Sequence, residues 1–171
     1  MMWSSVVLLG FVTLQRLTEL IYARRNTAQL LAQGAREIAP GHYAYLVALH
    51  AAWLGGLWWL AADRPIEWFW FAVFAVAQLL RVWVLYSLGH RWTTRIIVLP
   101  GAHLVATGPY RFLRHPNYVI VAVELAVLPL VFGLVAYAVF FSLINVIFLF
   151  VRIRAEDAAL RTPAPAEHSA A

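Results

Sequence analysis

The stretch GPYRFLRHPNY, residues 108–118, gathers side chains that can do chemistry in the middle of an apolar chain. Two arginines can bind anions, a histidine can hold or release a proton, and two tyrosines offer aromatic faces and hydroxyl groups. Each has an ordinary explanation at a membrane surface, where arginines contact phosphates and tyrosines belong to the interfacial belt. A simple turn needs fewer such residues, so the combination favours a binding site.

This stretch ends a polar segment, residues 90–118, that is longer than a connection between two adjacent helices requires. Loops beyond about 12–15 residues tend to be functional or disordered. Disorder is not expected, because the segment carries apolar anchors: Trp92, Ile96, Ile97, Val98, Leu104, Val105, Tyr110 and Phe112. Pro109 and Pro116 restrict the backbone of the residue before each. We therefore expect a rigid loop that folds back on the membrane face.

Polar residues also lie inside the apolar segments: Gln15, Arg16, Glu19, His50, Gln78, Arg81, Glu124 and Asn145. A charge at the middle of a membrane helix costs roughly 2.5–3.5 kcal/mol on insertion scales, so such groups are usually paired or face a cavity. Arg16 and Glu19 are three residues apart and can pair. These groups either hold the helices together or serve function, and His50 is expected to pack or hydrogen-bond. Glu124 is the best functional candidate, seven residues after Asn117 and on the same helical face.

The composition indicates one polytopic membrane protein. The 171 residues are 63% hydrophobic and 12% charged, with a mean hydropathy of +0.75, which is too apolar for a soluble domain. The chain has no cysteine, which excludes disulfides, thiolate metal sites and a cysteine nucleophile. All 13 basic residues are arginines, and they form no dense run. Nucleic-acid binding is therefore not expected.

Five membrane helices account for the apolar segments, since one span needs about 20 apolar residues. Three are single spans, at residues 2–23, 42–62 and 66–89, and residues 118–151 form a hairpin of two short helices around Pro129 and Gly133. The prediction is thus an all-α integral membrane protein. Residues 1–160 form one domain, and residues 161–171, rich in proline and alanine, form a disordered tail.

Arginine-rich connections alternate with a connection that is acidic on balance, DRPIE, and with an uncharged hairpin tip. The basic residues of the arginine-rich connections are Arg24, Arg25 and Arg36, then Arg91, Arg95, Arg111 and Arg114, then Arg152, Arg154 and Arg161. Cytosolic loops are enriched in arginine and lysine. We expect a cell-membrane protein with its N-terminus outside and its polar loop and C-terminus in the cytosol.

The string LVATGPYRFLRHPNY, followed by an apolar hairpin and then RIRAEDAAL, closely resembles the isoprenylcysteine carboxyl methyltransferase family of membrane enzymes. The family likeness covers about residues 75–160. Two further strings, GAREIAPGHY and LGHRWTTRIIVLPG, are similar to the bacterial branch that includes methyltransferases of long-chain alkylpyrones and alkylresorcinols. The resemblance implies five membrane helices and a cytosolic cofactor-binding loop.

It also implies S-adenosylmethionine as the methyl donor and a lipophilic or prenylated acceptor, with no metal. Carried over by position, the donor-contacting residues are Ala102, His103, Leu104, Val105, Tyr110, His115, Pro116, Asn117, Tyr118 and Glu156. Arg152 is the catalytic residue, directed toward the substrate, and Glu124 is a second candidate for binding the substrate. Arg111 is expected to face the lipid headgroups.

The residues suit this chemistry. Tyr110 and Tyr118 can face a sulfonium cation and an adenine, and Glu156 can pair with an amino group. A carboxylate acceptor with a pKa near 4 is already ionised, whereas a phenol near 10 needs a base or an anion-stabilising field. His115, His103 and Glu124 are candidate bases, and the choice between carboxylate and hydroxyl stays open. In either case an apolar acceptor should enter sideways from the lipid.

Two other classes remain open. A membrane reductase using NADPH could have a related helical core and a pocket lined by acids and arginines. A small transporter or scaffold is the third possibility, and it favours inverted repeats and helices broken at mid-membrane.

Overall fold

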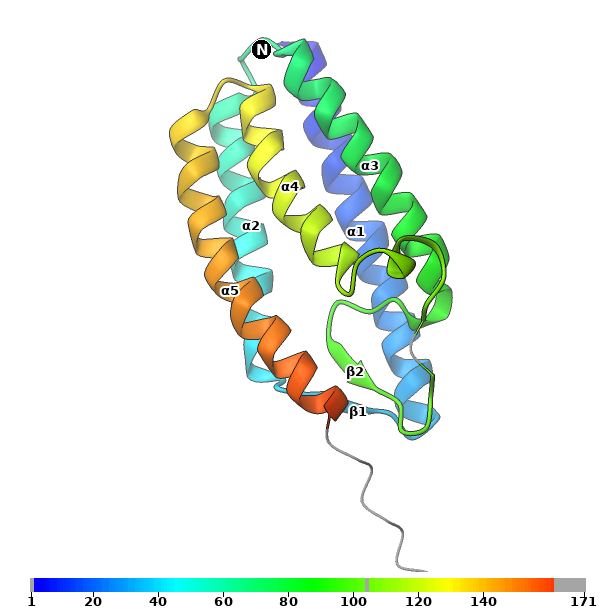
Figure 1. Ribbon diagram of the computed structural model, residues 1–171. Coiled ribbons are helices and arrows are strands. Elements are labelled where there is room, and N and C mark those ends of the chain that lie inside the picture. The colour runs from blue at the N-terminus through cyan, green and yellow to red at the C-terminus, as the bar shows by residue number, and fades with distance from the viewer. Residues whose placement is uncertain (1, 104, 162–171) are drawn as a thin grey trace, which may run out of the picture.

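The computed structural model describes residues 2–103 and 105–161, which form five α-helices and a short two-stranded ribbon (Figure 1). Of the tail for which disorder is expected, residues 161–171, Arg161 is the last residue of a helix and the others lie outside the described residues. The elements are α1 (Trp3–Ala32), β1 (Arg36–Ile38), α2 (Gly41–Ala61), α3 (Trp68–Leu88), β2 (Ile96–Val98), α4 (Pro116–Val131) and α5 (Val135–Arg161), with two short 3₁₀ helices, η1 (Gly89–Arg91) and η2 (Gly108–Arg111), in the loop between α3 and α4. The prediction of an all-α membrane protein is confirmed.

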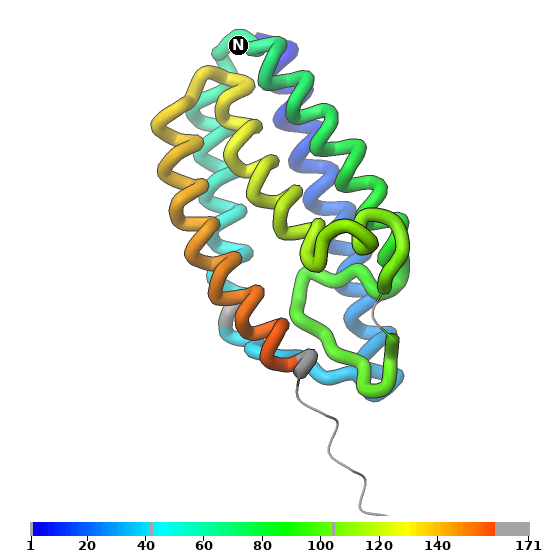
Figure 2. The backbone as a smooth tube through the Cα atoms, viewed as in Figure 1, coloured from blue at the N-terminus to red at the C-terminus, as the bar shows by residue number. Residues whose placement is uncertain are grey.

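Four helices, α1, α2, α3 and α5, are long and apolar enough to cross a membrane. The fifth, α4, is apolar but has only 16 residues, about 24 Å at 1.5 Å per residue, against a hydrocarbon core of about 30 Å. It begins at Pro116, deep enough along the bundle for the loop before it to lie beside α1 and α3 (Figure 2). The last part of the polar loop, residues 108–115, therefore lies against the helix bundle.

The predicted hairpin of the last two helices is confirmed, with Gly133 at a φ of 67° in the turn between them. The expectation that both helices are short is wrong for α5, which has 27 residues. Arginine, alanine, glutamate and leucine dominate residues 152–161 and are good helix formers, so the helix continues after the apolar segment ends. For the same reason α1 continues nine residues past its predicted end at Ala23.

The ribbon of β1 and β2 was not predicted. The two strands pair antiparallel, with Glu37 opposite Ile97, and Arg95 binds Glu37 at 2.8 Å. At the start of the loop, the Asn26 amide donates hydrogen bonds to the carbonyls of Gly89 and Trp92. These contacts join α1 and the strand that follows it to the segment after α3, and they hold the loop against the bundle.

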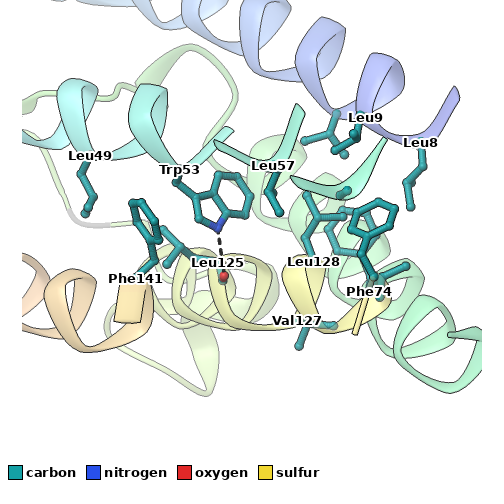
Figure 3. Packing of buried hydrophobic residues seen from close by; sticks show 14 residues of the cluster. Leu8, Leu9, Leu49, Trp53, Leu57, Phe74, Leu125, Val127, Leu128 and Phe141 are labelled. Carbon is teal, nitrogen blue, oxygen red and sulfur yellow. Dashed lines mark hydrogen bonds between the residues drawn. The ribbon is translucent and has the colours of Figure 1, made fainter. Parts of the chain in front are cut away.

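The apolar core occupies the end of the bundle opposite the loops. Its centre is Trp53 on α2, whose side chain is 1% exposed and whose Nε1 donates to the carbonyl of Leu125 on α4 at 3.2 Å (Figure 3). Leu9, Leu57 and Leu128 pack in the same cluster and are fully buried. This end of the bundle is tightly packed, and the two cavities lie toward the other end, beside the polar loop.

Gly56 provides a test of that packing. It faces Tyr137 of α5, whose hydroxyl donates to the carbonyl of Trp53 at 2.8 Å, and a Cβ at position 56 would overlap this hydroxyl. We expect Gly56→Ala to lower the free energy of unfolding in detergent by about 1–3 kcal/mol, because overpacking displaces Tyr137. Gly55→Ala is the matched control, since nothing lies within 4 Å of a Cβ there. Equal stability of the two variants would contradict the α2–α5 contact.

A buried ion network crosses the middle of the bundle. Arg81 on α3 binds Glu19 on α1 at 2.5 Å and Glu124 on α4 at 2.6 Å. Arg16 binds the same two carboxylates, at 3.2 Å and 2.6 Å, which confirms its predicted pairing with Glu19 and adds a second partner. Gln78 donates to Glu124 at 2.8 Å. Two arginines and two glutamates thus cancel in charge and connect three helices.

Candidate functional site

A polar cavity of about 410 Å³ lies between the loop of residues 91–118 and the C-terminal turns of α5. Ligand sites commonly measure about 300–1,000 Å³, so this cavity is large enough for a cofactor. Its walls come from segments more than 30 residues apart in sequence, the start of α4 and the end of α5, which the hairpin returns to one place.

The hydroxyl of Tyr118 lies at the centre of this cavity's polar wall. It donates a hydrogen bond to the carboxylate of Glu156 and accepts one from Nε of Arg152 at 2.9 Å. Arg152 also donates from Nη2 to the carbonyl of Thr94 at 2.6 Å. Its remaining Nη1 has no hydrogen-bond partner among the residues that the structure describes. The guanidinium is therefore held at two points with one nitrogen available for a ligand.

His115 closes the wall at the first turn of α4. Its ring stacks on that of Tyr118, with centroids 5.4 Å apart, and its Nε2 lies 3.3 Å from Asp157. Arg114 binds the same carboxylate at 3.2 Å. Asp157 thus fixes the orientation of the polar loop relative to α5.

Tyr110 contributes a neutral aromatic face. Burial, and after it the carboxylate of Glu156, raises the pKa of the Tyr110 phenol above its ordinary value. Both causes disfavour the charged phenolate. Tyr110 is therefore suited to contact a ligand rather than to act as a base.

A second, apolar cavity of about 330 Å³ adjoins the first. It is lined by residues of all five helices, Arg81 being the contribution of α3, and by residues 92–94 of the polar loop. Leu17 of α1 and Val47 of α2, in this lining, are 53% and 42% exposed. Because these residues are at once cavity wall and outer surface, the cavity opens sideways between α1 and α2. In a membrane protein this opening faces lipid.

The two cavities share a wall made of Trp92, Thr93, Asn117, Tyr118 and Arg152. Two atoms in this wall, Nε1 of Trp92 and Oδ1 of Asn117, are buried without a hydrogen-bond partner within the described part of the chain. Buried polar atoms are normally paired. The wall between the two cavities thus contains two polar atoms that the described part of the chain does not satisfy.

Most of the predicted donor-contacting residues line the polar cavity: Ala102, His103, Val105, Tyr110, His115, Asn117, Tyr118 and Glu156. Arg152, predicted as the catalytic residue, lines both cavities. Pro116 begins α4 and is buried outside the lining, and Leu104 lies outside the described residues. The chain fold thus brings together eight of the ten positions, and their roles stay predictions.

Glu124 lies away from this group. Its carboxylate is buried and bound by Arg16, Arg81 and Gln78, and Glu124 lines neither cavity. Its prediction as a substrate contact rested on sharing a helical face with Asn117. That face of α4 also packs against α1 and α3, and Arg16 and Arg81 of these helices bind the Glu124 carboxylate.

Sequence reasoning assigned no site role to two residues of α2. Tyr43 and His50 line the apolar cavity, although Tyr43 ends the string GAREIAPGHY and His50 stands in no quoted motif. Arg91 and Arg95 line the polar cavity as well. Both stand in the string LGHRWTTRIIVLPG, but no role beyond marking a basic loop was predicted for them.

Comparison with known proteins adds independent information. The family model for the isoprenylcysteine carboxyl methyltransferase (ICMT) family matches residues 70–162, which include both helices of the hairpin and the whole polar loop. An uncharacterized protein of Bacillus subtilis (strain 168), YpbQ, is 38% identical over 161 residues, covering 91% of this chain and 95% of that protein. No solved structure matches the chain.

Proposed function

The chain belongs to the isoprenylcysteine carboxyl methyltransferase family, and from that premise we propose that it is a membrane-embedded O-methyltransferase that uses S-adenosylmethionine. Membership of a methyltransferase family and helices able to span the membrane support a membrane methyltransferase. We propose in addition the identity of the methyl donor, the class of the methyl acceptor and transfer to an oxygen atom.

The observation that carries the proposal is the shared wall at Tyr118 and Arg152. A polar cavity opens on one side of it, and an apolar cavity that reaches the lipid-facing surface opens on the other. A water-soluble donor and a lipid-soluble acceptor need separate entrances and one meeting point. Holding two reactants in line at such a point can contribute roughly 7–11 kcal/mol to catalysis.

The residues of the polar cavity fit the donor. When bound, S-adenosylmethionine supplies an electrophilic methyl group on a sulfonium. Glu156 provides a carboxylate for the amino group, and Tyr110 and Tyr118 provide aromatic faces. Asn117 Oδ1 and Trp92 Nε1 are the buried, unpaired atoms at the wall where the methyl group would be presented.

Arg152 would orient the acceptor. Its Nε and Nη2 are fixed by Tyr118 and Thr94, so Nη1 can donate to an acceptor oxygen entering from the apolar cavity. A carboxylate needs only this positioning, whereas a hydroxyl must also lose its proton. His115 and His103, the candidate bases in the polar cavity, lie on the donor side of the wall.

The acceptor is proposed to be lipophilic, either an isoprenylcysteine-like carboxylate or the hydroxyl of a long-chain alkylpyrone or alkylresorcinol. The walls of the apolar cavity, Leu17, Leu20, Leu46, Val47, Leu54 and Leu149 among them, suit an alkyl or prenyl chain. Binding at a lateral opening lets that chain stay in the bilayer.

We further propose that the end bearing the polar loop is cytosolic and that residues 1–160 act as one domain. The arginine-rich connections all lie at the loop end of the bundle, and the turns at its other end carry Arg64 with Asp63 and Glu67 (Figure 1). The positive-inside tendency then gives an outside N-terminus. Labelling of single cysteines introduced after α1 and after α2 in intact cells checks this orientation.

Donor binding tests the proposal directly. We expect Glu156→Gln to weaken S-adenosylmethionine binding about 10- to 100-fold, because a charge-assisted hydrogen bond is worth roughly 1.5–3 kcal/mol. Isothermal titration of the purified protein in nanodiscs measures this affinity. Glu67→Gln, at the opposite end of the bundle, is the matched control and should bind the donor normally.

The same titration separates the alternatives. A reductase would bind NADPH, and a transporter or scaffold would bind neither compound with a dependence on Glu156. Incubation with labelled donor, a farnesylcysteine, an alkylpyrone and an alkylresorcinol then identifies which acceptor takes up the methyl group. Saturable NADPH binding without donor binding would overturn the proposal.

A further inference from the structure

One of the two groups that fix Arg152 is a backbone carbonyl in the polar loop. Nη2 of Arg152 donates to the carbonyl of Thr94 at 2.6 Å, and Thr94 lies between η1 and β2, outside every helix and strand. A backbone carbonyl moves only with its chain, so the position of this acceptor depends on what holds the neighbouring residues. This part of the loop therefore helps to decide where the Arg152 guanidinium points.

Arg95, the residue after Thr94, is held from a distant part of the chain. Its Nη1 donates to both carboxylate oxygens of Glu37 on β1, at 3.0 Å and 2.8 Å. The strand register explains this contact, because Glu37 lies opposite Ile97 of β2 and Arg95 comes two residues before Ile97. Residues two apart in an extended chain point to the same face. The two charged side chains are thus diagonal neighbours across the ribbon, a spacing that long side chains can bridge.

Tyr43, at the start of α2, adds a second contact to the same part of the loop. The Arg95 guanidinium lies over the Tyr43 ring, 4.6 Å from its centroid, and Thr94 Oγ1 lies 3.3 Å from the Tyr43 hydroxyl. We call Glu37, Tyr43 and Arg95 the loop clamp. Both strands of the ribbon also contact α5 (Figure 1). The clamp therefore lies beside the helix that carries Arg152.

The ion pair of the clamp is too exposed to contribute much to the stability of the fold. The side chains of Glu37 and Arg95 are 19% and 41% exposed, and ion pairs near the surface contribute little because water screens them. The pair does fix the direction of Arg95, since both carboxylate oxygens accept from one nitrogen. Its loss should therefore change the geometry of the loop more than the stability of the protein.

We propose that Glu37 is a positioning residue for Arg152 and acts through Arg95 and the Thr94 carbonyl. The inference rests on the proposed function, in which Arg152 orients the methyl acceptor. Glu37 itself lines neither cavity, and it precedes the segment matched by the family model, residues 70–162. Its removal releases Arg95, lets this part of the loop shift, and leaves Nη2 of Arg152 without a fixed acceptor.

The first measurement follows Arg152 itself, with neither donor nor acceptor present. Phenylglyoxal reacts across two nitrogens of a guanidinium, so an arginine whose Nη2 is held by a carbonyl reacts slowly. In the full-length protein in nanodiscs, we expect Arg152 to react about 3- to 10-fold faster in Glu37→Ala than in the wild type, because part of a hydrogen bond to a charged group is lost. Mass spectrometry of peptides gives the rate, and the exposed Arg154 on the same helix is the internal reference.

Four variants show whether the ion pair is responsible. Glu37→Gln keeps an oxygen that can accept from Arg95, so Arg152 should react at close to the wild-type rate. Arg95→Met and the double variant Glu37→Ala/Arg95→Met should each match Glu37→Ala, because the two residues act as one unit. Glu67→Ala removes an exposed carboxylate at the opposite end of the bundle and should match the wild type. Thermal midpoints should stay within about 2–4 °C of the wild type in all of them.

Methyl transfer is the second measurement. We expect kcat to fall about 10-fold in Glu37→Ala, with the affinity for S-adenosylmethionine within about two-fold of the wild type, because a misplacement of about 1 Å can cost as much as 100-fold in rate. Full kcat in Glu37→Ala, or unchanged reactivity of Arg152, would overturn the inference. Weaker donor binding in Arg95→Met but not in Glu37→Ala would also overturn it, since Arg95 would then bind the donor directly.

The two proposals fail differently. If Arg152 reacts faster in Glu37→Ala but the wild type neither binds the donor nor methylates farnesylcysteine, an alkylpyrone or an alkylresorcinol, the O-methyltransferase is wrong and the link from Glu37 to Arg152 stands. If the wild type methylates one of these acceptors and Glu37→Ala equals it in both measurements, the methyltransferase stands and the positioning role of Glu37 is wrong.

Discussion

Arg152→Ala should reduce kcat for methyl transfer by about 10²- to 10³-fold while leaving donor affinity within a few-fold of the wild type. Removing one preorganised hydrogen-bond donor at a reacting oxygen typically has an effect of this size. Arg152 is the residue on α5 that lines both cavities and holds Tyr118 and Thr94 through two of its nitrogens. Its third nitrogen, Nη1, binds neither Tyr118 nor Thr94 and can donate a hydrogen bond to the acceptor.

Two further variants sharpen this prediction. Arg152→Lys keeps the charge but cannot reach Tyr118, Thr94 and an acceptor together, so we expect less than a tenth of wild-type kcat to return. Arg154→Ala, two residues along the same helix, removes an exposed guanidinium that lies over Phe150 and lines neither cavity. It should retain full turnover. Single-turnover measurement with labelled donor gives the rates, and a fully active Arg152→Ala enzyme would remove Arg152 from the chemistry.

Arg81→Met should lower the free energy of unfolding by about 3–5 kcal/mol, the range for breaking one partner out of a buried ion pair. Arg81 has a side chain that is 5% exposed and binds carboxylates from two other helices. Without it, Glu19 and Glu124 share one remaining arginine, Arg16, inside the membrane-embedded bundle. Thermal or denaturant unfolding in detergent, followed by circular dichroism, measures the loss.

The control for charge removal is Arg25→Met, on the exposed surface of α1, which should change stability by less than about 0.5 kcal/mol. Replacing Arg16, Glu19, Arg81 and Glu124 together by methionine and leucine should recover most of the lost stability, because no unpaired charge then remains. If the fourfold variant is as unstable as Arg81→Met, the unpaired charge does not explain the loss in the free energy of unfolding, and the prediction is wrong.

The fold class was predictable because the bilayer constrains it strongly. Apolar segments of about 20 residues cross a membrane as helices, since no other open structure satisfies the backbone there. The hairpin followed from Pro129 and Gly133, which interrupt a segment too long for one span. Helix ends were less predictable, because residues 24–32 and 152–161 are polar yet good helix formers, and the helices run through them.

The candidate site was partly predictable for a related reason. Tyr110, His115, Asn117 and Tyr118 stand in one polar stretch whose density is unusual in this chain, and Glu156 was assigned through its spacing after Arg152 in the family resemblance. The density of polar residues in one stretch and the spacing between two residues on one helix can both be read from the sequence. The structure brings these residues around one cavity, and their roles stay predictions.

Other features depended on contacts between distant segments. The role of Glu124 as a substrate contact was argued from its helical face alone, and only packing revealed that Arg16, 108 residues earlier, occupies that face. His50 was expected to pack or to form a hydrogen bond, because the cavity around it is made by five helices and the polar loop, which meet only in the folded bundle.

The amino-acid sequence by itself thus determined the membrane helices, the basic end of the bundle and the identity of the polar loop, since hydropathy, charge and residue density act locally along the chain. Tertiary structure alone decided which polar groups find partners. Arg81 and Glu124 neutralise each other across helices. In the described part of the chain, Nη1 of Arg152 and Oδ1 of Asn117 find no hydrogen-bond partner. Pairing in a low-dielectric interior depends on distances of a few ångströms between residues far apart in sequence, and those distances exist only after the helices pack.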